Sequence, residues 1–185
     1  MKAKKLIFFA FPLMLVAGVG CSKDNTEEKK TETVSKTKMK VVLSEKQYPY
    51  YICEQMVEFQ FKKDEFVANV LQASKDKDKV KDVLKSVDEI EEILDALENI
   101  EVPSKYKDKQ KVMLEGVSEA RKGLESIKNS SKKDKTNIQE SVPKTVGNLS
   151  TADIELWEPI VKEISKENPD AYEKALNNKM EQHKK

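Results

Sequence analysis

Histidine and arginine are almost absent from this chain of 185 residues, which has one of each. The histidine, His183, lies in a lysine-rich C-terminal end, where a frayed segment cannot hold a general base against a nucleophile. Zinc sites need about three or four Cys, His or carboxylate ligands, and the sequence contains no such cluster. These absences argue against Ser/His/Asp and Cys/His catalysis, and we expect neither an enzyme nor a bound metal or cofactor.

Carboxylates alone could still support hydrolysis, because a glycosidase needs only two positioned acids. Each acid that could be nominated also fits the wet side of an amphipathic helix. A carboxylate-dependent hydrolase therefore stays as an alternative to a non-catalytic protein. The nominated acids are Glu54, Glu58 and Glu65, and Glu155 and Glu158 beside Trp157.

The charge balance offers no basic surface for nucleic acid. The chain has 34 basic and 33 acidic side chains, and every basic residue except Arg121 is a lysine. Lysine lacks the planar fork with which arginine recognises phosphates and carboxylates, and nucleic-acid binding needs a basic face that displaces counterions. We expect no nucleic-acid partner and no specific anion site.

The N-terminal segment has the parts of an export signal that ends at a cysteine. Lysines occupy positions 2, 4 and 5, residues 6–16 are apolar, and residues 18–20 are small and lead to Cys21. The segment resembles a bacterial lipoprotein signal peptide, in which the cysteine takes a diacylglyceryl group and becomes the new N-terminus after cleavage. The resemblance implies a membrane anchor, of the palmitate-bearing kind, on Cys21.

Two other interpretations of this segment remain open: an ordinary secretory peptide with an incidental cysteine, and an uncleaved membrane anchor. Residues 6–20 are shorter than the roughly 18–20 apolar residues that a spanning helix needs, and Pro12 interrupts them. Removing residues 1–20 leaves 31 basic and 33 acidic side chains, a formal charge of −2. We expect an extracytoplasmic protein that is lipid-anchored to the cell membrane.

With Cys21 lipidated, Cys53 has no partner for a disulfide, so the domain must be held together by its core. Cys53 adjoins Ile52 and Met56 on an apolar helix face. Buried cysteine commonly behaves as a small hydrophobe, which favours a core thiol over a reactive thiol or an intermolecular crosslink.

The rest of the chain divides into a tether and one domain. Residues 21–44 contain no aromatic residue and many Lys, Glu and Thr residues, a composition that cannot bury enough surface to offset its ordering entropy. We expect a flexible tether over 21–44 and a single helical domain over 45–185.

Helical periodicity runs through this domain, and no strand pattern competes with it. The spacing predicts helices over 49–74, 78–101 and 104–129, the last two joined by a short break and therefore antiparallel. Lysines that open the third helix are expected to pair with the acidic end of the second. The predicted inner faces are Ile52, Met56, Phe59, Phe66, Val67, Val70 and Leu71; Val80, Val83, Leu84, Val87, Ile90, Leu94, Leu97 and Ile100; and Tyr106, Gln110, Met113, Val117, Ala120, Leu124 and Ile127.

Shorter helices are expected after residue 130. Residues 138–149 suggest a short or kinked helix that Gly147-Asn148 closes, and Ser150 or Thr151 could cap the next one. That helix would turn Ile154, Trp157, Val161 and Ile164 inward, and Asn168-Pro169 predicts the start of a last helix over about 170–182. The last helix would carry a thin apolar stripe of Ala171, Tyr172, Ala175, Leu176 and Met180. The predicted fold is an all-α antiparallel bundle built on a long helical hairpin.

The break at 102–106 followed by a long amphipathic helix resembles a helical hairpin in small uncharacterised lipoproteins of Bacillus-like Gram-positive bacteria. In those hairpins a histidine often stands four residues after the position of Tyr106, where this chain has Gln110. The resemblance implies an all-α extracytoplasmic domain and brings no activity with it.

Four aromatic residues are the remaining candidates for ligand or partner contacts: Tyr48, Tyr50, Tyr51 and Trp157. Their rings combine an apolar body with a polar group, so exposed ones could bind a glycan, a hydrophobic ligand or a protein. The alternative is that they close the ends of the bundle. We expect a non-catalytic binding module that contacts an envelope protein or glycan, with a receptor for a small hydrophobic or glycan ligand as the alternative.

Overall fold

A computed structural model describes residues 40–133 and 138–183, and within them the fold is all-α. Three long helices come first: α1 (Gln47–Ala73), α2 (Val80–Glu98) and α3 (Lys107–Lys133). They are followed by α4 (Val142–Ser150), the π-helical segment η3 (Thr151–Trp157), α5 (Glu158–Glu167) and α6 (Pro169–His183). Short 3-10 turns, η1 (Lys77–Lys79) and η2 (Ser104–Tyr106), precede α2 and α3. The predicted fold class is thus confirmed.

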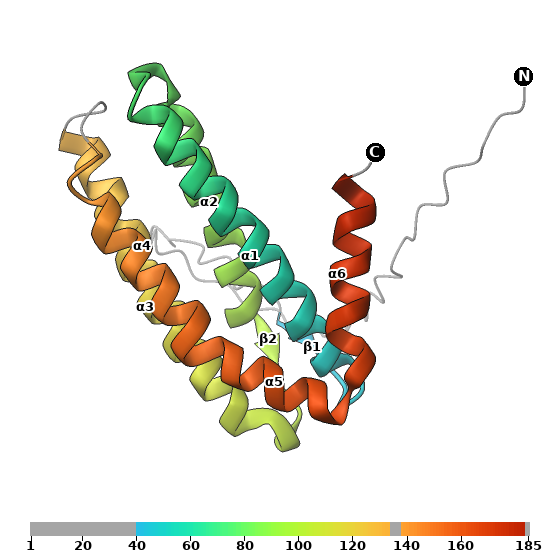
Figure 1. Cartoon of the computed structure of the whole chain (residues 1–185). Helices are drawn as coiled ribbons and strands as arrows, with labels where there is room; N and C mark the ends of the chain where they lie inside the picture. The colour runs from blue at the N-terminus through green and yellow to red at the C-terminus, as the bar shows by residue number, and fades with distance from the viewer. Residues whose placement is uncertain (1–39, 134–137, 184–185) are drawn as a thin grey trace, which may run out of the picture. The chain divides into compact units, whose positions relative to one another are not determined.

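The successive long helices α1, α2 and α3 and the run α4–η3–α5 alternate in direction around one core, whereas α6 runs in the same direction as α1 (Figure 1). Helix α1 packs against α2, α2 packs against α3, and the run α4–η3–α5 lies along α3. After Asn168-Pro169 the chain turns back, and α6 packs against α1. Helix α1 therefore meets α5 and α6, which follow much later in the chain, at one end of the bundle.

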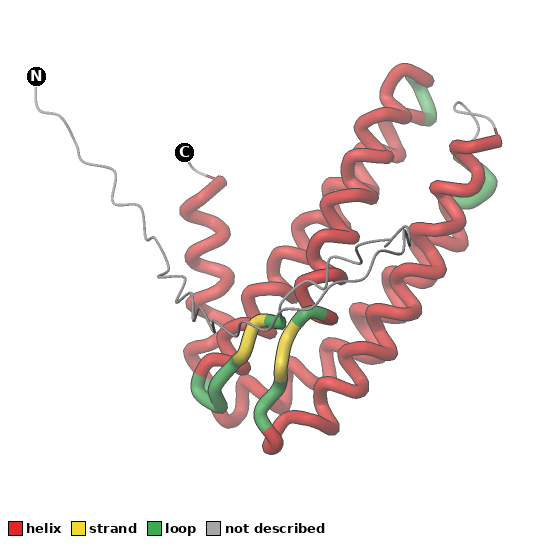
Figure 2. Tube along the Cα trace, turned by 180° about the vertical axis from the view of Figure 1, so that it is seen from behind, coloured by secondary structure: helices red, strands yellow, loops and turns green. Residues whose placement is uncertain are grey.

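A two-stranded parallel ladder, which the sequence did not predict, joins the start of the domain to the α2–α3 connection (Figure 2). Strand β1 (Val41–Val42) pairs with β2 (Ile100–Glu101), with Val41 opposite Ile100. The next residue, Leu43, is buried. The predicted boundary at residue 45 is therefore wrong, since residues 41–43 belong to the domain.

Most of the predicted inner faces are buried. Every residue predicted on the inner faces of α2 and α3 is buried, except Leu84, which is partly exposed. The prediction is wrong at four positions, Val67, Leu71, Ile154 and Met180, whose side chains are exposed. The first two lie one position past buried Phe66 and Val70, beyond the edge of the face that α2 and α4 cover.

The run from Val142 to Glu167 is one continuous helix, so the predicted closure at Gly147-Asn148 is wrong. Ser150 does not cap a helix, because its backbone is helical (φ −70°, ψ −40°) and its side chain makes no capping bond. The irregularity falls instead in η3, where the N–H of Glu158 bonds to the carbonyl of Asp153. Pro159 has no N–H and its ring crowds the preceding turn, and the wider π-turn gives it room.

Ion pairs connect neighbouring helices. The lysines that open α3 were expected to pair with α2, but their partners lie elsewhere. The α2–α3 pairs come from Arg121, which binds Asp95 and Glu98, and from Lys128, which binds Asp88 and Glu91. The lysines at the start of α3 turn the other way: Lys105 binds Glu167 and Lys109 binds Glu163, both on α5. Exposed pairs of this kind each contribute about 0–1 kcal/mol, so core burial remains the main stabilising contribution.

Candidate functional site

Tyr48 is a core residue and not a contact for a ligand. It has no exposed surface and stacks on Tyr106 with ring centroids 4.5 Å apart. Its hydroxyl donates to Oε1 of Gln110 at 3.0 Å, and the Gln110 amide donates to the carbonyl of Leu97 at 2.8 Å. Burial raises the pKa of Tyr48, as does the neighbouring Tyr106. Gln110 of α3 thus links Tyr48 of α1 to the backbone of α2.

Tyr50 and Tyr51 hold helices together through their hydroxyl groups. Tyr51 is half-buried and donates to the carbonyl of Ala96 on α2 at 2.9 Å. Tyr50 is exposed and donates to the carboxylate of Asp170 at the start of α6, at 2.9 Å. Lys174 lies over the Tyr50 ring, 5.2 Å from its centroid. Of the three tyrosines, Tyr50 alone is exposed.

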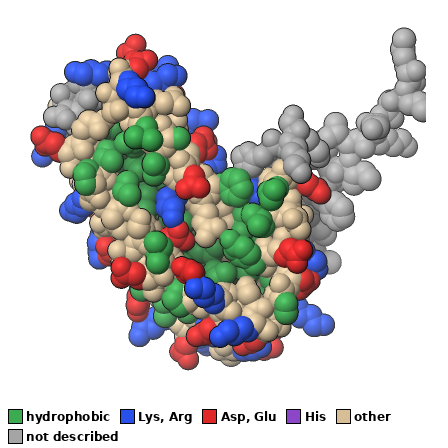
Figure 3. Space-filling view, viewed as in Figure 1, with side chains coloured by type: hydrophobic (Ala, Val, Ile, Leu, Met, Phe, Trp, Pro, Cys, Tyr) green, Lys and Arg blue, Asp and Glu red, His purple; other side chains and the backbone are tan. Residues whose placement is uncertain are grey.

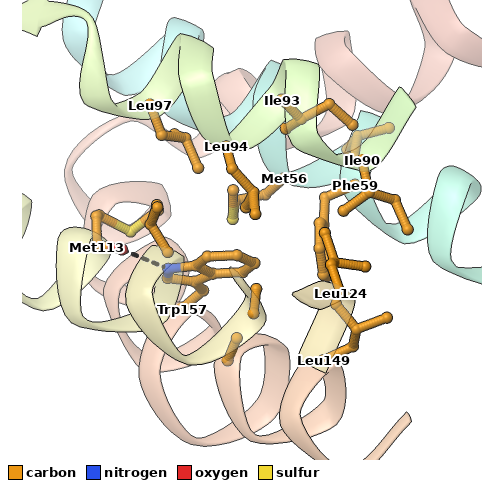
Figure 4. Packing of buried hydrophobic residues seen from close by; sticks show 14 of the residues in the cluster. Met56, Phe59, Ile90, Ile93, Leu94, Leu97, Met113, Leu124, Leu149 and Trp157 are labelled. Atoms are coloured by element: carbon orange, nitrogen blue, oxygen red, sulfur yellow. Dashed lines mark hydrogen bonds between the residues drawn. The ribbon is translucent and has the colours of Figure 1, made fainter. Parts of the chain in front are cut away.

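Trp157 lies at the centre of the core, where its indole ring is surrounded by side chains of α1, α2 and α3 (Figure 4). Its Nε1–H donates to the carbonyl of Met113 at 2.9 Å, and its ring meets Phe59 edge to face at 4.7 Å. Gly116 makes room for it: a Cβ at that position would lie 2.1 Å from Nε1. The four predicted aromatics therefore do not gather into one site, and three of them serve packing.

A groove with a volume of about 650 Å³ lies between α1, α5 and α6, next to the end of η3. Hydrophobic side chains are seen on this face between α6 and the rest of the bundle (Figure 3). Met56 and Trp157 lie beneath the groove, nearly or fully buried, while Val161 and Tyr172 line its walls. The complete lining is Met56, Gln60, Asp153, Trp157, Glu158, Val161, Lys162, Ser165, Lys166, Pro169, Tyr172 and Glu173.

Polar groups inside the groove already have partners. Asp153, from the π-helical segment, is 8% exposed and forms an ion pair with Lys63 of α1. The Tyr172 hydroxyl donates to Oε1 of Gln60 at 3.0 Å, which ties α6 to α1. No buried side-chain nitrogen or oxygen in the described part of the chain lacks a hydrogen-bond partner. The interior of the groove is therefore apolar and electrostatically compensated.

The rim of the groove carries both signs of charge. Glu158 and Lys162 pair along α5 at 2.5 Å. Lys166 on α5 and Glu173 on α6 are exposed at the same opening, and neither is within ion-pair distance of a described residue. Two lysines and two glutamates thus surround the opening and leave it without net charge.

The structure assigns no chemistry to the other residues considered from the sequence. Glu58, Glu65 and Glu158 pair with Lys179, Lys62 and Lys162, while Glu54 and Glu155 are exposed on their helices. Cys53 is a buried free thiol, and burial raises its pKa to about 11 despite an opposing hydrogen bond from Ser165. Nowhere in residues 40–133 and 138–183 do three or more His, Cys, Asp or Glu side chains form a group that could hold a metal.

The predicted signal peptide, Cys21 and most of the predicted tether lie outside the described residues. Among the helices that the structure does describe, none is both long and apolar enough to span a membrane.

The chain was compared with known protein families. Residues 40–174, from the start of strand β1 into α6, match the domain of unknown function DUF7018. The chain belongs to this family. No curated protein and no solved structure is similar enough to the chain to match it. The matched region contains every residue that lines the groove.

Sequence reasoning missed the groove because α1 builds it together with α5 and α6, which follow much later in the chain. Met56, Val161 and Tyr172 were each assigned to the apolar stripe of a separate helix, with no signal that these stripes meet. Trp157 was singled out as a potential contact, but it supports the groove from below.

Proposed function

We propose that this protein is a lipid-anchored extracytoplasmic binding module without catalytic activity, and that it holds an envelope component in the groove between α1, α5 and α6. The observation that carries the proposal is the groove itself: a mainly apolar hollow of about 650 Å³ with compensated polar groups. Binding sites for small molecules typically have volumes of about 300–1,000 Å³ and walls of this composition. An apolar hollow whose buried polar groups are already paired suits retention of a ligand better than acid–base chemistry.

The anchor part of the proposal depends on Cys21 and the segment before it. Two acyl chains give stable membrane attachment, whereas one chain gives marginal attachment. Replacing Cys21 with Ala should leave the precursor uncleaved and without lipid, as measured by labelling with a fatty-acid analogue. Normal processing and continued acylation of Cys21→Ala would contradict this assignment.

The binding part can be tested by crosslinking on intact cells with a matched pair of variants. Val161→Lys introduces a charge into the wall of the groove, and the long lysine stem can carry its ammonium toward solvent, which limits the damage to the fold. Leu71→Lys makes a similar change at an exposed position of α1 that does not line the groove. We expect Val161→Lys to lose the crosslinked envelope component and Leu71→Lys to retain it. Equal capture by both variants would refute the groove as the binding site.

A further inference from the structure

We infer that the ligand of the groove is a small amphiphile with an apolar body and a head group of no net charge. This inference rests on the proposed function and adds the chemical class of what is bound. Three features support it: the apolar wall of the groove, the pairing of the buried polar groups beneath that wall, and the balance of charge at the opening.

The wall favours an aliphatic or aromatic body. Val161 of α5 and Tyr172 of α6 face the same hollow as Met56 of α1, so apolar surface from three helices converges on one volume. Removing apolar ligand surface from water gives about 25 cal/mol per Å². The volume of about 650 Å³ suits a single chain or ring system.

The buried polar groups beneath the groove already have partners and offer nothing to a ligand's charged end. The Trp157 Nε1–H is bonded to Met113, the Tyr172 hydroxyl to Gln60, and the Asp153 carboxylate to Lys63. A charge carried into this interior would lose its hydration without gaining a partner, which is costly. The polar end of the ligand therefore stays at the opening.

The opening selects against net charge on that polar end. Glu158 and Glu173 balance Lys162 and Lys166, so the opening has no net charge with which to attract an anion or a cation. A non-ionic or zwitterionic head group needs no such attraction. Both head groups share the inferred chemistry, and the experiment below separates them.

The test uses one dodecyl chain with four head groups, each below its micellar concentration: dodecyl maltoside, dodecylphosphocholine, dodecanoate and dodecyltrimethylammonium. The protein is the chain from Ser22 to Lys185, which keeps the whole core described above, from Leu43 to Ala175. Binding is measured by calorimetry, and the fluorescence of Trp157, the only tryptophan, reports on the groove. We expect dodecyl maltoside or dodecylphosphocholine, which have no net charge, to bind at least about 10-fold more tightly than both charged ligands. The relative affinities of these two compounds then distinguish a non-ionic from a zwitterionic ligand.

The same pair of variants locates the site. Val161→Lys should weaken binding of the preferred amphiphile about 10-fold, and Leu71→Lys should leave it unchanged. The head-group order is measured on the wild-type sequence, so it does not depend on how well a variant folds. Tighter binding of dodecanoate or dodecyltrimethylammonium, or no binding of any of the four, would overturn the inference. If none binds while Val161→Lys still abolishes crosslinking on cells, the inference fails and the proposed function stands; if crosslinking is also unaffected, both fail.

Discussion

At the scale of single residues, small side chains decide how closely the helices approach. Gly116 and Gly123 lie on the face of α3 that meets the α4–η3–α5 run. A Cβ at Gly123 would lie 3.0 Å from the Asn148 Cβ and 3.1 Å from the carbonyl oxygen of Thr145. The Thr145 hydroxyl in turn donates to the carbonyl of Gly123 at 2.8 Å. The absence of a side chain lets α3 approach α4 at Gly123 and Trp157 of η3 at Gly116.

Gly116 provides the sharpest stability prediction. Gly116→Ala would place its Cβ against Trp157, whose ring is fully buried and fixed by its bond to Met113. We expect a loss of about 1–3 kcal/mol or more in the free energy of unfolding, measured by denaturant titration. Gly147→Ala is the control, because nothing lies within 4 Å of its Cβ position, and alanine in a helix should gain about 1 kcal/mol. Equal effects of the two substitutions would contradict the close packing of Trp157 on α3.

Cys53 should be unreactive toward thiol reagents in the folded protein. It is fully buried, and burial raises the pKa of its thiol from 9.0 to about 11. Because the folded pKa is raised, the thiol contributes stability that is present below pH 9 and lost as the pH rises toward 11, about 2–3 kcal/mol at most. The stability difference between the wild type and Cys53→Ala should therefore become less favourable to the wild type across this pH range. Rapid labelling of the native protein below pH 9 would contradict this account.

At the scale of elements, the sequence predicted the helices with a strong period together with their faces, and misplaced the boundaries of those whose signals conflict. Helices α2 and α3 were predicted with their buried faces, since apolar residues recur there at spacings of three and four. In the α4–η3–α5 run, Gly147 and Pro159 suggested breaks, but tertiary packing on α3 maintains one helix and absorbs Pro159 in a π-turn. The strand pair was missed because two residues are too few to show a period. The groove was missed because no local pattern encodes where three helices meet.

Helix α6 should be the least protected helix of the described bundle. Only Ala171 and Ala175 of α6 are buried, both small, whereas α2 buries several large apolar side chains. Polar contacts supplement this packing, among them Tyr50 with Asp170 and Lys179 with Glu58. We expect amide hydrogens of α6 to exchange through openings of lower free energy than those of α2 and α3. The measurement is native-state hydrogen exchange.

A substitution can test the attachment of α6 directly. Tyr50→Phe removes the hydroxyl that bonds Asp170 and keeps the ring. Exchange should become faster in α6 and stay unchanged in α3. If the amides of α6 were as protected from exchange as those of α2, and Tyr50→Phe did not change this, apolar packing alone would hold the helix.

At the scale of the whole molecule, one core links every helix, so the domain should unfold in a single cooperative step. Leu94 is fully buried in this core, and α2 packs against both α1 and α3. Leu94→Ala should therefore cost about 2–5 kcal/mol. The whole transition should shift to lower denaturant concentration without splitting, because neither half of the bundle keeps its buried face alone. In each protein, helical circular dichroism and Trp157 fluorescence should report the same midpoint as each other, since the indole contacts the core that all long helices share.

Two separate midpoints in the variant would mean that the α1–α2 hairpin and the α3–α5 layer have independent cores. The groove would then lie at an interface able to open, and its ligand would stabilise the contact between the two parts.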